Sequence, residues 1–189
     1  MIIIDYGLGN LSSIQNMLKQ LGFNPVISGD YRLISKSKNL ILPGVGNFEI
    51  GIQNLKKKNL DYEIKNVSEK GATILGICLG MHLLFNSSEE GSSKGLELIN
   101  GNVKKFKFKD DNIKVPHMGW NFIKFTKKNK LFFNFNKEIK FYFAHSYYVD
   151  CSTDNICSLT NYGFDFPSTI NKGNIYGVQF HPEKSHNFG

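Results

Sequence analysis

Cysteine, arginine and long apolar runs are what this chain has least of, and each shortage argues against a class of protein. Its 189 residues include three cysteines, Cys78, Cys151 and Cys157, none of which form a Cys-x-x-Cys pair. An odd number at this spacing indicates neither a disulfide framework nor a cysteine-bound zinc site, and a chain of this length buries a full core without such links. We therefore expect a reducing, cytoplasmic setting, with no metal and no cofactor.

Arginine is almost absent although the chain is basic. Lysine and arginine together number 23, Arg32 is the only arginine, and the formal net charge is +7. Recognition of nucleic acid usually exploits the arginine fork, whereas these lysines stand in short clusters, such as residues 56–58, that are typical of a solvated helix face. We expect no nucleic-acid partner.

Long apolar runs, linkers and repeats are missing as well. The chain opens with an apolar stretch that meets a charge at Asp5, so it is too short for a signal peptide or a membrane span. We expect no membrane contact and a single domain over residues 1–189.

Short apolar segments alternate with amphipathic ones over the first eighty residues. Strands are expected at 2–4, 25–27, 40–42 and 72–75, and helices at 11–21, 47–57 and 60–70. Asn10 or Ser12 can cap the first helix and Gly22 can close it. This alternation predicts a doubly wound α/β sheet.

The second half has a different pattern. Residues 101–109, 120–126 and 140–149 alternate apolar and polar side chains, as half-buried antiparallel strands do. We therefore expect a mixed, mainly parallel sheet flanked by helices, with the chemistry on its parallel part.

Cys78 stands between two glycines, Gly76 and Gly80, at the junction of an expected strand (72–75) and a helix-like stretch (81–85). A strand that turns sharply into a helix presents the turn residue at the top of a sheet, and flanking glycines permit the tight backbone. The helix start directs N–H groups at the sulfur and favours the thiolate. Cys78 is therefore predicted to be a nucleophile rather than a buried structural cysteine.

A cysteine nucleophile needs a base, and the base needs an orienting group. Val178 and Phe180 are predicted to end a buried strand, which leaves His181 at the carboxyl edge of the sheet, where α/β proteins place active sites. Pro182 stops the strand, and Glu183 can fold back to fix the imidazole tautomer. Four other histidines compete for the role, but none carries a carboxylate so close in a post-strand turn: His82, His117, His145 and His186.

Six motifs in a fixed order give the chain a resemblance to a known family. They are IDYG at 4–7 with Gly9 and Asn10, LPGVGNF at 42–48, the Cys78 elbow, PHMGWN at 116–121, FYFAHSYY at 141–148, and the block around His181. The chain resembles the class I (triad) glutamine amidotransferases from end to end. Within them it looks like the glutaminase subunits of imidazole glycerol phosphate synthases, which supply ammonia for histidine biosynthesis.

The resemblance implies a catalytic triad and an oxyanion hole. Cys78 would attack the side-chain amide of glutamine, His181 would carry the proton to departing ammonia, and Glu183 would orient the histidine. The backbone N–H groups of Leu79 and Val45 would hold the oxyanion. The Val45 peptide would have to turn over first, in response to the partner subunit.

The resemblance also implies a place for substrate. Glu90 would receive the α-ammonium group, and the backbone of Gly46, Ser146 and Tyr147 would hold the rest of the amino acid. Position 82 departs from the family pattern, because the family has a glutamine there that contacts substrate. His82 is expected to bind glutamine less well and to titrate near neutral pH.

The resembled partner is a (β/α)8-barrel cyclase subunit that forms a heterodimer with the glutaminase. Asn10, Trp120, Tyr142 and Lys184 match positions at that contact, although Trp120 and Tyr142 are equally compatible with a core. The sequence stops at Gly189 where the family continues with a closing helix, so a C-terminal helix is expected to be missing.

Three alternatives stay open at this point. A relative could feed ammonia to a surface-polysaccharide sugar amidation pathway, since residues 183–189 resemble that branch. A cysteine peptidase or γ-glutamyl hydrolase could share the fold, which residues 43–48 and 116–121 disfavour. A regulatory module could keep the fold without the chemistry, which the intact Cys78, His181 and Glu183 set disfavours.

Overall fold

The parallel half of the central sheet consists of four strands from the first part of the chain and one from near its end. The computed structural model describes residues 1–133 and 139–189. Its main sheet has the strand order β2-β1-β3-β4-β12-β11-β10-β7-β8, and the strands from β2 to β12 run parallel. These strands are β1 (Ile2–Ile4), β2 (Val26–Ser28), β3 (Asn39–Leu42), β4 (Thr73–Ile77) and β12 (Ile175–Val178).

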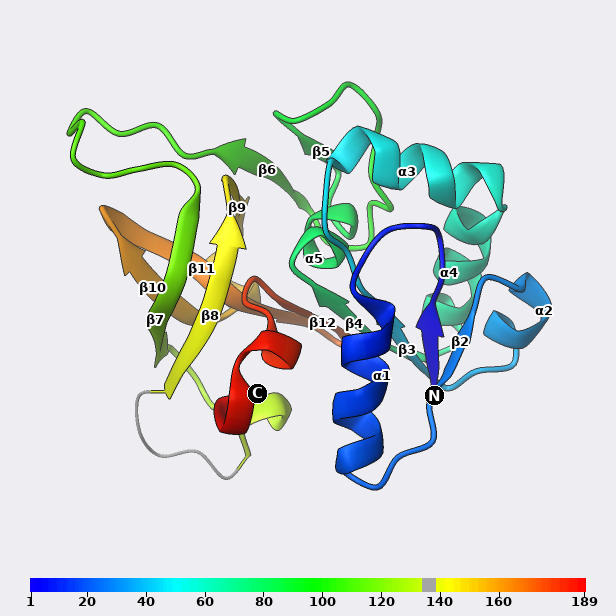
Figure 1. Cartoon of the computed structure of the whole chain (residues 1–189). Coiled ribbons are helices and arrows are strands. Elements are labelled where there is room, and N and C mark those ends of the chain that lie inside the picture. The colour runs from blue at the N-terminus through cyan, green and yellow to red at the C-terminus, as the bar shows by residue number, and fades with distance from the viewer. Residues whose placement is uncertain (134–138) are drawn as a thin grey trace.

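The remaining strands of the main sheet are antiparallel, and a smaller sheet lies beside them (Figure 1). The antiparallel strands are β7 (His117–Phe125), β8 (Ile139–His145), β10 (Ile156–Tyr162) and β11 (Phe164–Lys172). The small sheet consists of β5 (Ser87–Ser88), β6 (Gly101–Lys105) and β9 (Tyr147–Cys151).

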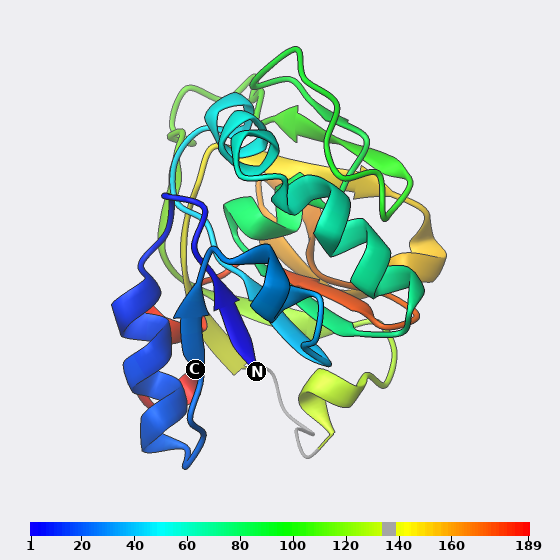
Figure 2. The same ribbon diagram turned by 90° about the vertical axis from the view of Figure 1, so that its right-hand side faces the viewer.

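Helices cover both faces of the parallel strands. Figure 2 shows α1 on one side and α3 and α4 on the other. The helices are α1 (Leu11–Gln20), α2 (Tyr31–Ile34), α3 (Phe48–Lys57), α4 (Leu60–Glu69) and α5 (Leu79–Leu83), with short 3-10 turns η1 (Lys130–Phe132), η2 (Thr153–Asn155), η3 (Pro182–Lys184) and η4 (His186–Phe188). In the part of the chain that the structure describes, no helix has the length and apolar character needed to cross a bilayer.

The two faces of the sheet build two cores because side chains alternate along a strand. Ile2 and Ile4 point into one cluster with α3, α4 and α5, whereas Ile3 points into the other with Ile14 and Leu18 of α1. All of these side chains are buried. The apolar run at the start of the chain is thus a strand covered on both faces.

The α/β class and the mixed sheet are confirmed, and several local expectations need correction. Residues 140–149 are not one strand, because the chain breaks at Ser146 between β8 and β9, which belong to different sheets. The strand expected at 101–109 ends at Lys105, and the helix α2 was not predicted. The buried strand expected to run to Phe180 ends at Val178.

The ends of α1 show which local signals were correct. Gly22 has φ +84°, a conformation that suits glycine at a helix end. Asn10 is at the N-cap position, but its side chain makes no capping hydrogen bond, and Ser12 lies inside the helix. Leu21, expected on the apolar face, is 62% exposed because it follows the last helical turn.

Candidate active site

Cys78 lies at the sharp turn between β4 and α5. Its backbone has φ +52° and ψ −111°, an unusual conformation for a residue with a side chain. A Cβ on Gly76 would come within 2.7 Å of the Gly80 oxygen, and a Cβ on Gly80 would overlap the Leu42 carbonyl. The flanking glycines are therefore required, and the predicted strand-to-helix elbow is confirmed.

His181 and Glu183 form a buried pair close to this elbow. His181 Nδ1 is 2.8 Å from Glu183 Oε1, and the two side chains are 2% and 1% exposed. The His181 N–H donates to the Tyr142 carbonyl at 2.9 Å, which fixes the chain after β12 against β8. Burial opposes a charge on His181, but its hydrogen bonds to Cys78 and Glu183 and their negative charges raise its pKa to about 9.

One cavity joins Cys78 to the other residues that the sequence singled out for substrate. Its volume is about 240 Å³. The structure brings together all of the predicted oxyanion and substrate positions around it: Val45, Gly46, Cys78, Leu79, His82, Glu90, Ser146 and Tyr147. Pro116, Met118, Ala144 and His145 complete the wall. Segments from both halves of the sheet therefore meet at this cavity.

The loop after β3 forms one wall, and its first residues pack closely against Tyr6 and the start of α5. The Tyr6 hydroxyl donates to the Pro43 carbonyl at 2.6 Å. A Cβ on Gly44 would come within 2.7 Å of both the Tyr6 oxygen and the Leu79 Cβ. Gly46 has φ +123°, which few other residues adopt. Val45 thus lies between two glycines, of which Gly44 packs against the start of α5.

Glu90 forms the polar end of the cavity. Its Oε2 accepts a hydrogen bond from the Phe48 N–H at 2.9 Å, and its own N–H donates to Ser88 Oγ at 3.1 Å. Burial raises the pKa of this carboxyl, although the bond from Phe48 opposes the shift. A cationic group in the cavity would favour the charged form of Glu90.

His82 is more deeply buried than the sequence suggested. It is 4% exposed, and its Nε2 lies 2.8 Å from Gln179 Oε1. Burial lowers the pKa of His82 to about 4, despite the hydrogen bond to Gln179. The expectation that this ring titrates near neutral pH is therefore wrong, because desolvation outweighs the effect of its uncharged partner.

A second histidine pair was not singled out from the sequence. His117 Nδ1 is 3.0 Å from His145 Nε2, and His145 Nδ1 is 2.7 Å from the Tyr147 carbonyl. Since a carbonyl only accepts, His145 must donate from Nδ1 and accept from His117 at Nε2. Burial lowers the pKa of His117 to about 4 and that of His145 well below its usual value, so both rings are neutral. The pair supports the backbone at Tyr147.

Cross-strand register was the signal that could have found this pair. His117 begins β7 and His145 ends β8, and the two residues are directly opposite each other in the antiparallel ladder. Opposed residues on one face have neighbouring side chains. The sequence alone did not establish the register of the two strands.

The residues expected at a partner contact lie near the C-terminal end of the described chain. Trp120 and Tyr142 are opposite each other on β7 and β8, with ring centroids 6.2 Å apart. Trp120 is 42% exposed and stacks on His186 at 5.8 Å. Lys184 lies in η3, and Asn10 is exposed at the start of α1, the helix that contacts η3. Trp120 and Tyr142 therefore do not belong to the buried core.

The other two cysteines have different surroundings. All three cysteines are free thiols. Burial raises the pKa of Cys151 to about 11, and burial also raises that of Cys157. Within residues 1–133 and 139–189, no group of three or more histidine, cysteine or acidic side chains is placed to hold a metal ion. Cys78 is the thiol with a histidine beside it.

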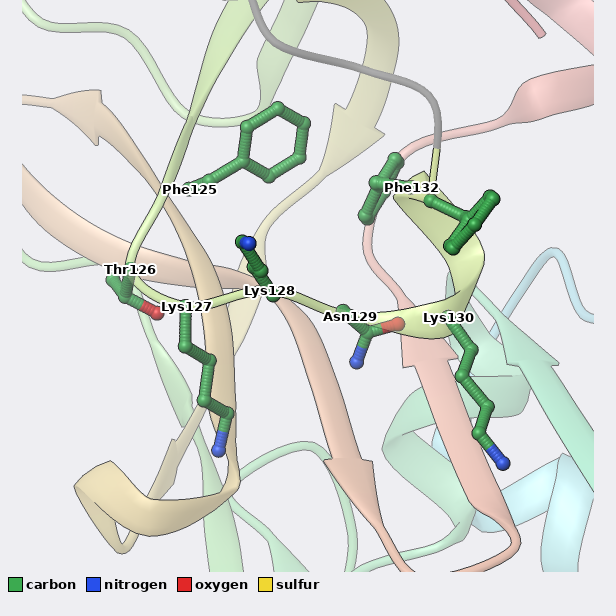
Figure 3. Close-up of a pocket in the computed structure, with 8 residues that line it drawn as sticks. Phe125, Thr126, Lys127, Lys128, Asn129, Lys130 and Phe132 are labelled. Carbon is green, nitrogen blue, oxygen red and sulfur yellow. The ribbon is translucent and has the colours of Figure 1, made fainter.

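A larger cavity of about 570 Å³ lies at the end of β7, away from Cys78 (Figure 3). Phe125 and Phe132 face each other there, with ring centroids 4.8 Å apart, while Lys127 and Lys130 extend away from the rings. None of the residues that line it belongs to the predicted site. Its described lining is mainly lysine and phenylalanine and holds no paired acid and base, unlike the cavity beside Cys78.

A family model and several curated relatives match nearly the whole chain. The family described as "Glutamine amidotransferase class-I" matches residues 2–188. The imidazole glycerol phosphate synthase subunit HisH 2 of Methanococcus maripaludis is 55% identical over 189 residues, which are 99% of this chain and 93% of the relative. The HisH subunit of Moorella thermoacetica is 45% identical over 97% of this chain and 87% of its own length. That of Sulfurimonas denitrificans is 45% identical over 99% and 92%.

Solved structures agree on the fold. A crystal structure described as a glutamine amidotransferase superposes with a TM-score of 0.75 at 16% identity, covering 96% of this chain and 90% of that one. The structure of PurLQS from Thermotoga maritima has a chain that superposes with a TM-score of 0.70 at 19% identity, covering 96% and 86%. At these identities the superpositions describe the fold alone.

Proposed function

The chain belongs to the class I glutamine amidotransferase family, and from this premise we propose that it is the glutaminase subunit of an imidazole glycerol phosphate synthase. It hydrolyses L-glutamine to glutamate and ammonia, and the ammonia passes to a cyclase subunit in histidine biosynthesis. Relatives that are 55% and 45% identical over nearly the whole chain carry that subunit name. These names favour this acceptor over surface-sugar amidation, and favour an amidotransferase over a peptidase or a regulatory module.

Catalysis begins with the Cys78 sulfur and His181. The thiolate attacks the side-chain amide carbon of glutamine and forms a tetrahedral intermediate. His181 then gives its proton to the amide nitrogen, and ammonia leaves as the thioester forms. Glu183, 2.8 Å from the imidazole, stabilises the imidazolium and fixes its orientation. His181 next removes a proton from water, which attacks the thioester and releases glutamate.

The intermediate carries a negative oxygen that needs hydrogen-bond donors. The N–H of Leu79 at the elbow and that of Val45 are the proposed pair, and both residues line the cavity with Cys78. Val45 lies between Gly44 and Gly46, which give the loop the freedom to turn its peptide. We assign completion of this hole to binding of the partner and its acceptor.

Substrate is held by groups that match its charges. Glu90 receives the α-ammonium group, which favours the charged carboxylate where burial opposes it. The backbone of Gly46, Ser146 and Tyr147 holds the amino-acid end, and His82 contributes to the same wall. The His117 and His145 pair keeps the Tyr147 carbonyl in place.

The partner is a cyclase subunit, for which we propose a (β/α)8-barrel fold. Asn10, Trp120, Tyr142 and Lys184 form the proposed contact. Trp120 is 42% exposed, and its neighbours Met118 and Phe122 on β7 are 63% and 54% exposed, so an apolar strip faces outward. We place the protein in the reducing cytoplasm, since its nucleophile works as a free thiol. We propose that it needs no cofactor and binds neither nucleic acid nor membrane.

One observation carries the chemical part of the proposal. Cys78 sits in a strained elbow beside a histidine that is itself hydrogen-bonded to a buried carboxylate. That arrangement is the signature of an activated nucleophile with a general base and an orienting group.

The decisive experiment is covalent labelling with a glutamine-like chloroketone or diazoketone, followed by peptide mapping. The label is expected on Cys78, and on neither Cys151 nor Cys157. Cys78→Ala should abolish glutamine hydrolysis and leave the far-UV circular dichroism unchanged. A label found chiefly on Cys151 or Cys157 would overturn the assignment. Formation of imidazole glycerol phosphate from glutamine, on addition of the cyclase subunit and its acceptor, tests the pathway.

A further inference from the structure

Gln179 contacts both Cys78 and His82, and the mechanism proposed for glutamine hydrolysis does not use it. Its side chain is fully buried, directly after β12. Its Nε2 donates to Cys78 Sγ at 3.8 Å, and its Oε1 lies 2.8 Å from His82 Nε2. The Gln179 N–H donates to the Ser168 carbonyl at 3.0 Å, which ties the residue to β11. A single amide therefore bridges Cys78 and a residue four positions along α5.

The two ends of this amide would have opposite effects on the sulfur. The NH2 group donates a hydrogen bond and stabilises a thiolate, whereas the carbonyl oxygen repels one. Which end faces Cys78 depends on what the other end meets. His82 decides this, because its Nε2 either carries a proton and binds the oxygen of Gln179, or lacks one and binds the NH2 group.

The contact with Gln179 assigns the proton of His82, because a neutral ring can carry it on either nitrogen. Burial keeps the pKa of the ring near 4, so at pH 7 it is neutral and carries one N–H group rather than two. With Gln179 Oε1 at 2.8 Å, that N–H must be on Nε2. A cationic imidazole is not needed for the contact, and the cavity receives no extra charge from it.

We propose that His82 is a positioning residue that locks the Gln179 amide with its NH2 group toward Cys78, so that Gln179 stabilises the thiolate in addition to His181. The proposal rests on the function proposed above, in which Cys78 is the nucleophile. It gives His82 a task that reaches the sulfur through Gln179.

Other titratable groups lie near Cys78, and their side chains are kept when this amide is changed. His181 is the charged neighbour, with its pKa raised to about 9 against the effect of burial. Burial, and then the charge of Cys78, raises the pKa of the Tyr6 phenol, which therefore stays protonated. Glu90 and His145 line the same cavity. Leucine at position 179 or 82 keeps all four side chains, although the His82 ring is one of the groups that lowers the pKa of His145. A shift shared by Gln179→Leu, which keeps His82, and His82→Leu, which removes it, can therefore be assigned to the amide.

The test is the pH dependence of Cys78 alkylation by iodoacetamide in the full chain, followed by peptide mass mapping. Gln179→Leu and His82→Leu should move the pH of half-maximal rate up by about 0.5–1 unit, which is a roughly three- to tenfold slower reaction at neutral pH. His82→Gln keeps an N–H donor and should restore most of the wild-type profile. Gln179→Glu, of the same size with a charge, should slow the reaction further.

Thr169→Val is the matched control. Thr169 is buried on β11 opposite Val178, and in the described residues its hydroxyl has no hydrogen-bond partner. Its profile should match that of the wild type. Circular dichroism checks folding, and Gln179→Glu serves if Gln179→Leu does not fold. Wild-type profiles in folded Gln179 and His82 variants, or an equal shift in Thr169→Val, would overturn the proposal. Failure of the glutamine analogue to label Cys78 would instead overturn the proposed function.

Discussion

Two histidines near Cys78 each contact a side-chain oxygen at the same distance, but one ring is charged and the other is neutral. In one, His181 is 2.8 Å from the Glu183 oxygen, and in the other His82 is 2.8 Å from the Gln179 oxygen. All four side chains are largely buried. The pKa of His181 is about 9 and that of His82 is about 4.

The difference shows that the partner, and not the burial, determines what a buried histidine can do. Desolvation opposes the charged ring in both places and is the largest effect in each. A carboxylate and a neighbouring sulfur overcome it at His181, whereas a neutral amide does not at His82. In the proposed mechanism one histidine therefore exchanges protons with substrate, and the other is the proposed hydrogen-bond donor to Gln179.

The largest effect should come from replacing the carboxylate beside His181 with an amide, the group that His82 contacts. Glu183→Gln removes the carboxylate while keeping its shape, so the pKa of His181 should fall and its ring orientation should loosen. We expect kcat for glutamine hydrolysis to fall by roughly 10²–10⁴, the usual range for a positioned general acid and base. Steady-state assay of glutamate release measures it. A loss below about threefold would contradict the role of Glu183.

The next largest effect should come from the oxyanion hole, whose contribution to kcat can be measured apart from that of the His181–Glu183 contact. If binding of the partner turns the Val45 N–H into the oxyanion hole, the isolated chain should hydrolyse glutamine slowly. Addition of the cyclase subunit and its acceptor should then raise kcat by roughly 10²–10³. Glu183→Gln should lose the same factor with and without partner, because the pair and the hole act separately. Full activity of the isolated chain would show that the hole is preformed.

Acid should destabilise the fold through the neutral histidines. His82 takes up a proton below about pH 6.5 in the unfolded chain but only near 4 when folded, so the unfolded state binds more protons between these values. Stability is then lost as the pH falls from 6.5 toward 4, by about 3 kcal/mol at most.

Urea unfolding measured between about pH 4.5 and 7.5 tests this statement. His82→Gln should reduce the slope of the unfolding free energy by up to about 1.4 kcal/mol per pH unit. His181 acts in the opposite direction, because its raised pKa adds stability that is complete below about 6.5 and is lost as the pH rises through 9. If the unfolding free energy of His82→Gln depends on pH as steeply as that of the wild type at acid pH, the neutral state of His82 is contradicted.

The smallest effect concerns substrate affinity. His82→Gln places the family's residue in the cavity wall and should lower KM for glutamine several-fold, which corresponds to about 0.5–1.5 kcal/mol for one hydrogen bond. Turnover should change little, since the contact is the same in ground and transition states. KM of the wild type should not depend on His82 ionisation between about pH 6 and 8. A KM that is the same in both proteins would restrict His82 to its contact with Gln179.

The sequence predicted local chemistry better than long-range placement. The elbow at Cys78 follows from glycines whose added Cβ atoms would strike the chain, and the His181–Glu183 contact spans two residues. Both are encoded within a few positions. The motif residues of the cavity were recovered through the family resemblance, since nothing in their spacing alone brings Val45 near Ser146.

What the sequence missed depends on register and burial. The contact between His82 and Gln179 joins residues 97 positions apart, and that between His117 and His145 joins residues 28 apart. A ring's pKa depends on how much water it loses, which only the packed structure shows. That is why the expected titration of His82 near neutral pH was wrong.

The most direct test of the account is the titration of the histidine rings by ¹⁵N NMR in the full chain, with signals assigned from His82→Gln and His181→Gln. We expect His181 to lose its proton near pH 9 and His82 to stay neutral down to about pH 4. Glu183→Gln should lower the first value and leave the second unchanged. If both rings titrate together near about 6.5, the contrast between the charged and the neutral pair is contradicted.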